Sequence, residues 1–129
     1  MKKVFVSILF AGFLNTAMAG DSASYTCIGS TTIFNQNKKI TVNLFEHRNS
    51  TGDGRETELT LIYGQYVLKG TFNNSDGSEG AVVLKDSKNN YKGNYSMSWS
   101  DSQVTLDGKI TLSGSVSTLN AVLDCEDLN

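Results

Sequence analysis

The only histidine of the chain lies in a run of charged and polar residues, Glu46-His47-Arg48-Asn49. An imidazole acts as a general base or binds a metal ion when a rigid scaffold holds suitable partners around it. The sequence offers no such set of partners for His47. We therefore expect a solvated histidine in a loop, with no metal site and no cofactor.

The chain has thirteen acidic residues, which are the next source of chemistry. The paired carboxyl groups of a glycoside hydrolase must meet in a cleft, where the pKa of one of them is raised. The acids of this chain fall mostly in predicted turns or on the polar faces of predicted strands, and we expect none at an inward position. We therefore expect that the protein is not an enzyme.

Aromatic side chains are the strongest remaining signal. The candidates for a ligand site or a core are Tyr63, Tyr66, Tyr91, Tyr95 and Trp99. Inside a barrel they could stack an apolar or planar ligand, with phenolic hydroxyl groups to orient it. They could also fill the interior, since an eight-stranded barrel is just wide enough for packed side chains. We favour the packed core. Phe34 and Phe45 lie off the inward phase, and we expect them to be exposed on a contact surface.

The two cysteines, Cys27 and Cys125, lie in the first and the last strand-like segments. Two cysteines in an exported domain favour a disulfide, and strand phase points both of them inward. In the chain-entropy description, closing a loop of about 100 residues stabilises the fold by about 4 to 5 kcal/mol. We expect a disulfide that joins the two ends of the domain.

Apolar and polar residues alternate with a period of two from Tyr25 onward, and this period is typical of β-strands. The predicted strands cover residues 24–28, 39–44, 58–63, 66–72, 80–85, 91–99, 104–112 and 116–125. Clusters of Gly, Asn, Asp and Ser separate them. A meander whose first and last strands are neighbours closes into a barrel. We predict an all-β fold with one small antiparallel up-and-down β-barrel of about eight strands, and a β-sandwich is the alternative.

The Asp107-Gly108 dipeptide is a typical signal for a tight hairpin. The apolar alternation of residues 104–112 nevertheless keeps one phase across the dipeptide. A two-residue turn would pair apolar with polar residues on both faces. We therefore predict one continuous strand, with Gly108 at a bulge or a bend.

Residues 1–19 have the pattern of a secretory signal, with Lys2-Lys3, an apolar run and the small-x-small site Ala17-Met18-Ala19. We expect a single all-β domain over residues 20–129, in the periplasm or secreted. Removing two of the eleven basic residues leaves nine against thirteen acidic ones, a formal charge of −4. This balance gives no basic footprint for nucleic acid. The apolar run is too short to span a bilayer, and several predicted strands are shorter than a membrane barrel needs.

Tyr25-Thr26-Cys27 near the predicted mature start and Cys125 near the end resemble the periplasmic inhibitors of c-type lysozyme. The segment from Tyr95 to Ser100, which contains Trp99, loosely resembles the aromatic stretch of that family. The resemblance implies a small β-barrel that blocks an enzyme cleft with a loop. The Ser-Gly-Ala motif of that loop is absent from this chain, and no inhibitory residue is carried over.

These observations favour a monomeric, exported, non-catalytic binding module. We expect it to recognise a protein or an envelope component through polar loops such as Arg48 to Arg55, in the manner of an inhibitor. The alternative is a carrier that holds a small apolar or planar ligand in the aromatic interior.

Overall fold

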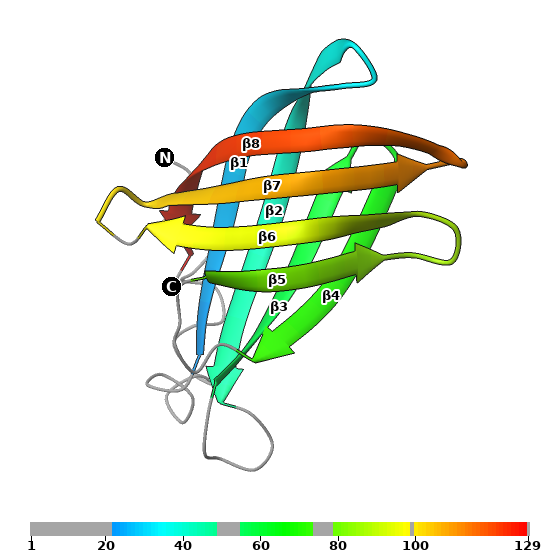
Figure 1. The fold of residues 1–129 in the computed structure, drawn as a ribbon. Helices are drawn as coiled ribbons and strands as arrows, with labels where there is room; N and C mark the ends of the chain where they lie inside the picture. Colours follow the sequence, from blue (N-terminus) through cyan, green and yellow to red (C-terminus); the bar gives the residue numbers. More distant parts are fainter. Residues whose placement is uncertain (1–21, 49–54, 74–78, 99, 129) are drawn as a thin grey trace.

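The computed structural model shows a closed barrel of eight antiparallel strands, each paired with its neighbours in the sequence (Figure 1). It describes residues 22–48, 55–73, 79–98 and 100–128, so the predicted signal peptide lies outside the described residues. The strands are β1 (Ser22–Ile33), β2 (Gln36–Arg48), β3 (Arg55–Tyr63), β4 (Tyr66–Asn73), β5 (Glu79–Lys85), β6 (Asn90–Ser98), β7 (Gln103–Leu112) and β8 (Ser115–Asp127). The predicted all-β barrel is confirmed, and the sandwich is not formed.

The barrel has two halves that cross each other. Strands β1 to β4 run steeply in one layer, and β5 to β8 run across them in the other (Figure 1). The halves join at β1 and β8, where residues 25–28 pair with residues 124–127. They also join at β4 and β5, where Lys69 with Lys85 is the one pair among the described residues. These two junctions are much shorter than the hairpin pairings within each half.

The core lies inside the barrel and consists of the apolar residues that alternate along each strand. Aliphatic side chains such as Ile40, Leu61 and Leu106 are fully buried, and residues at the intervening positions are mostly more exposed. Burial of such side chains is the main favourable contribution to folding, at about 25 cal/mol for each Å² of apolar surface. The apolar face of each strand therefore points to the interior.

The two ends of the barrel differ in their connections. At one end, called here the hairpin end, two-residue turns at 34–35, 64–65 and 113–114 join successive strands, with the longer turn 86–89 beside them. Phe34 and Asn35 both have positive φ, at 52° and 65°, which suits the right-handed twist of the flanking strands. The opposite end, called the loop end, carries the connections through 49–54, 74–78 and 99–102.

Strand β1 is longer than the sequence pattern predicts, since it continues past Ile28 to Ile33. The inward positions in this extension include Gly29 and Thr31, which give no apolar signal. Thr31 is buried, and its hydroxyl group donates a hydrogen bond to the carbonyl oxygen of Asn120 at 2.7 Å. A polar residue can occupy the interior here because the backbone of β8 satisfies it.

Residues 103–112 form one strand, so the prediction for Asp107-Gly108 is confirmed. Gly108 pairs with Gly93 on one side and Leu119 on the other without a break in register, so the predicted bulge is not present. A Cβ atom at Gly108 would clash with the carbonyl oxygen of Lys92 and lie 2.6 Å from the Cα of Gly93. The close approach of β6 and β7 is therefore the reason for glycine at this position.

Candidate functional site

The predicted aromatic candidates do not converge on one cavity. Tyr91 and Tyr95 are fully buried core residues, and Tyr63 is nearly so. The Tyr91 hydroxyl group donates a hydrogen bond to the carbonyl oxygen of Asn94 at 2.9 Å. Burial raises the pKa of Tyr91 to about 12 and raises the pKa of Tyr95 as well. Their burial supports the packed-core interpretation, while Trp99 lies outside the described residues.

Tyr63 and Tyr66 do lie together at the hairpin end, where they help to line a groove of about 340 Å³. Phe34 lines the same groove and is partly buried against the core, so it is not the freely exposed residue that the phase predicts. The Tyr66 hydroxyl group lies 3.3 Å from Ser113 Oγ, and this contact lowers the pKa of Tyr66. The aromatic residues here cover the end of the core.

The predicted disulfide between Cys27 and Cys125 is present. The two residues lie directly opposite each other in the short pairing of β1 with β8, and Cys27 is fully buried. A buried disulfide has no thiolate to react, so its role is structural.

Glu46 contradicts the expectation that no acid occupies an inward position. It is in phase with Leu44 on β2 and is 8 % exposed. Its negative charge adds to the effect of burial in raising the pKa of Tyr95. The nearby inward position of β3 holds Thr57, whose buried hydroxyl group has no hydrogen-bond partner. Among the described residues Glu46 is the only buried carboxyl group, so no interior acid pair is formed there.

His47 lies on strand β2 and not in a loop, which corrects the prediction from its polar surroundings. The imidazole ring stacks on Phe45, with 5.1 Å between ring centroids and 28° between the ring planes. Its Nε2 atom lies 3.0 Å from Glu58 Oε2 and 3.6 Å from Glu56 Oε1. Strand pairing explains this cluster, because Glu58 lies opposite Phe45 and Glu56 lies opposite His47.

We call Phe45, His47, Glu56 and Glu58 the acidic-aromatic surface. They occupy the outer face of β2 and β3 toward the loop end, beside a shallow groove of about 320 Å³ that Phe45 and Glu58 help to line. The sequence predicted Phe45 on a contact surface but not its three neighbours, because Glu56 and Glu58 lie on a second strand that a loop joins to β2. The outward alternation of residues 45 and 47 was the signal that could have found it.

No group of three His, Cys, Asp or Glu side chains suited to a metal ion occurs in the described ranges. In the same ranges no helix is long and apolar enough to cross a membrane. No protein-family model matches the chain, and no match was found among curated proteins or among solved structures.

Proposed function

We propose that this domain is an exported, non-catalytic binding module that recognises a basic protein through the acidic-aromatic surface. The observation that carries the proposal is the stacked Phe45–His47 pair next to two glutamates on the outer face of the barrel. The predicted export and the disulfide agree on an oxidising compartment.

The chemistry of the surface suits a protein partner. Aromatic residues are enriched at the centres of protein interfaces, where they supply much of the binding energy. Glu56 and Glu58 offer negative charge for lysine or arginine side chains, which speeds encounter and selects the partner. All four residues lie on paired strands, whose backbone is already ordered. Binding therefore costs little conformational entropy.

The surface also leads into the loop that the sequence favours for recognition. Strand β2 ends at Arg48 and strand β3 begins at Arg55, and residues 49–54 between them lie outside the described residues. The preference of the sequence for residues 48–55 therefore stays a prediction, and the proposal rests on the four strand residues alone.

The alternative functions have less support. A carrier for small ligands needs interior space, whereas Tyr91 and Tyr95 are buried among the core residues. A hydrolase needs a pair of carboxyl groups in a cleft, and Glu46 is the only buried acid in the described part of the barrel.

A binding assay with c-type lysozyme, a basic protein, tests the proposal. Calorimetry should detect binding by the unmodified protein. Phe45→Ala, and separately the double variant Glu56→Gln with Glu58→Gln, should each weaken binding at least about tenfold, since interface anchors contribute about 1 to 2 kcal/mol or more. The control is Glu79→Gln with Asp101→Asn, which removes two exposed acids from the other half of the barrel.

Equal binding by all of these variants would contradict the assignment of the surface. The proposed function itself would be rejected if lysozyme does not bind and the immobilised domain retains no basic protein from an envelope extract.

A further inference from the structure

The lysines of the described chain are concentrated toward the hairpin end of the barrel. Every one of them lies in a hairpin-end turn or in the part of a strand nearer that end: Lys38, Lys39, Lys69, Lys85, Lys88, Lys92 and Lys109. The described acids lie mostly toward the loop end, with Asp86 as the clear exception. The chain has a net negative charge, but its hairpin end is a basic region.

Four of these lysines form two cross-strand pairs on the outer face of β4 to β7. Lys69 lies opposite Lys85, and Lys92 lies opposite Lys109. Like charges in directly opposite positions destabilise a sheet. Within the described residues, none of the four amino groups lies within 4.0 Å of a carboxylate. This unfavourable arrangement is explained if an anionic partner neutralises it.

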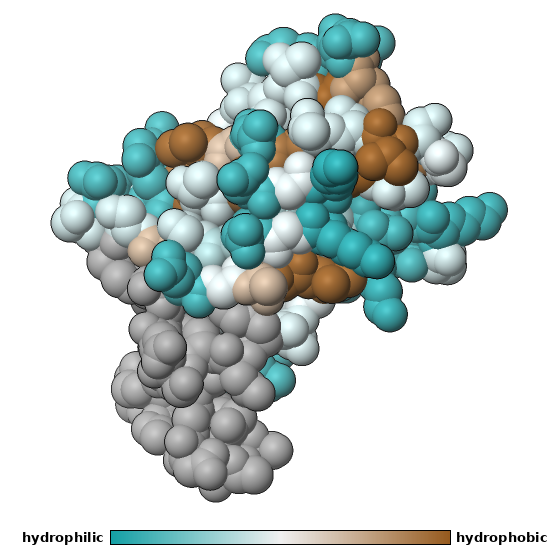
Figure 2. Space-filling model, in the orientation of Figure 1, coloured by the Kyte–Doolittle hydropathy of each residue, from teal (hydrophilic) through white to brown (hydrophobic). Residues whose placement is uncertain are grey.

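Exposed valines lie among these lysines. Val83 is directly opposite Lys92 and is 49 % exposed, and Val67 is two residues from Lys69 and is 41 % exposed. We call these six residues the lysine face. In the space-filling view, hydrophilic side chains in teal gather over the half formed by β5 to β8, with hydrophobic patches in brown beside them (Figure 2). Asp107, two residues before Lys109, marks its boundary.

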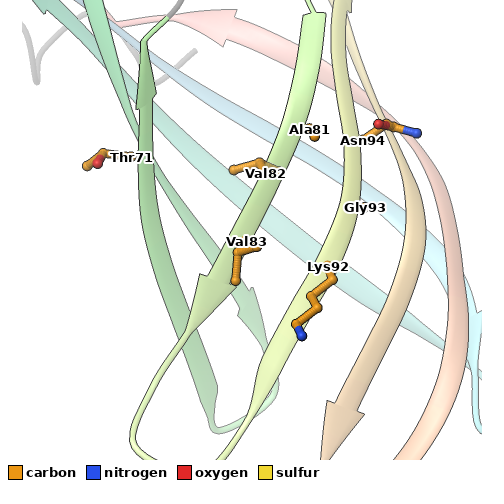
Figure 3. Close-up of a pocket in the computed structure, with 7 residues that line it drawn as sticks. All are labelled: Thr71, Ala81, Val82, Val83, Lys92, Gly93 and Asn94. Atoms are coloured by element: carbon orange, nitrogen blue, oxygen red, sulfur yellow. The ribbon is translucent and has the colours of Figure 1, made fainter.

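A groove of about 590 Å³ begins at the edge of the lysine face, where Val83 and Lys92 line it, and lies where β4 and β5 separate. The strands cross closely at Gly70, where a Cβ atom would clash with the carbonyl oxygen of Val83, and beyond this point they diverge. Thr71 stands on the β4 side, while Val82 points from β5 toward β4 (Figure 3). Lys92 also lines the groove, so an apolar surface and a cation meet there.

We propose that the lysine face binds the phosphate headgroups of an anionic phospholipid bilayer. Lysine amines near such a surface attract it by about 1 kcal/mol each, and the exposed valines add apolar contact. The described outward positions of β4 to β7 hold no aromatic residue, so a nucleic acid would find no base-stacking platform. This site is separate from the acidic-aromatic surface and from its proposed partner.

Flotation with lipid vesicles tests the proposal. The protein should bind vesicles that mix phosphatidylcholine with phosphatidylglycerol, should not bind phosphatidylcholine alone, and should dissociate at high salt. Lys69→Gln with Lys85→Gln, or Lys92→Gln with Lys109→Gln, should weaken binding about thirtyfold. Lys38→Gln with Lys39→Gln removes the same charge from β2 and should change binding much less.

Two further measurements distinguish a bilayer from a dissolved polyanion and check that the variants are folded. Val67→Thr with Val83→Thr keeps the charge and should weaken vesicle binding without changing the weaker binding of soluble polyphosphate. No variant should melt at a lower temperature than the parent protein by circular dichroism, and the Lys69/Lys85 and Lys92/Lys109 variants should melt at the same or a slightly higher temperature because they remove like-charge pairs. All variants should bind lysozyme as the parent does.

Equal binding to both kinds of vesicle, or full binding by the Lys92 and Lys109 variant, would overturn the proposal. Polyphosphate binding as strong as vesicle binding, with no effect of the valine changes, would assign the face to a dissolved polyanion instead.

Discussion

At the scale of single residues, Tyr91 and Tyr95 bring hydroxyl groups into an otherwise apolar interior. Burial raises the pKa of each because a phenolate would lose its hydration there. Folding is therefore linked to the neutral phenol. The stabilising contribution is complete below the unfolded pKa of about 10 and is lost as pH rises toward the folded values.

This linkage predicts alkaline unfolding. The melting temperature of the parent protein should fall steeply above about pH 10, where unfolded tyrosine ionises. Tyr95→Phe has no group to ionise at that position, so its melting temperature should fall less over the same pH range. Thermal melts in buffers from about pH 8 to 11 measure the difference, and parallel curves for the two proteins would contradict the role of Tyr95.

The residue scale also shows where the sequence was misleading. Strand alternation correctly placed Tyr91 and Tyr95 inside. It also places Glu46 inside and His47 outside, but the charged composition of their segment favoured a loop. Composition reports the average solvent exposure of a residue type, whereas the position in a strand decides the exposure of each residue. Because composition indicated a loop here, the sequence did not predict that His47 and the two glutamates would share one outer face.

At the scale of elements, β6 and β7 meet at two facing glycines. Gly93 and Gly108 lie opposite each other on the inner face, and a Cβ at Gly93 would lie 2.6 Å from the hydroxyl oxygen of Tyr91. The glycines thus let two strands and an aromatic side chain approach closely. The alternation of residues 104–112 predicted the strand itself. The reason why position 108 needs a glycine lies in the neighbouring strand β6, which the alternation does not reveal.

Alanine substitution at these glycines should separate crowding from backbone effects. Gly108→Ala should lower the free energy of unfolding by about 1 to 3 kcal/mol, the range for an overpacked core. Gly80→Ala is the matched control, because a Cβ there has no atom within 4 Å, and it should change stability by less than about 0.5 kcal/mol. Urea denaturation gives both values. Equal effects would show that loss of glycine, and not crowding, is responsible.

The sequence predicted the number and order of the strands better than their lengths. Periodic apolar residues mark the middle of a strand, where the core is deep. Directly beyond Ile28 the inward positions are held by Gly29 and Thr31, a small and a polar residue, which the backbone and side chains of β8 complement. Similarly, nothing in the sequence marks Phe34 as a turn residue with positive φ. Such features arise from neighbours that are distant in the sequence.

At the scale of the whole molecule, the barrel is closed by two short junctions. The junction of β1 with β8 contains the Cys27–Cys125 disulfide, which links residues 98 positions apart. The junction of β4 with β5 has one strand pair among the described residues. Chain closure through the disulfide therefore contributes to the whole barrel and not to a single hairpin.

Replacing Cys27 and Cys125 together with Ala should markedly destabilise the domain. Opening a loop of about 100 residues removes about 4 to 5 kcal/mol of stabilisation. For a domain of this size, that loss lowers the melting temperature by at least about 10 °C. Calorimetry should give the same value for the reduced parent protein. A decrease of only a degree or two in either case would show that strand pairing alone closes the barrel.

The described lysines lie toward the hairpin end and most described carboxylates toward the loop end, where Arg48 and Arg55 offset only part of the negative charge. We therefore expect an electric dipole along the barrel. A dipole experiences a torque in the field of a charged surface, even where the attraction is still weak. The domain should therefore rotate before contact, so that its lysine face turns toward an anionic surface and its acidic-aromatic surface toward a cationic protein. The orientation of each encounter would then be set by the distribution of charge and not by chance collision.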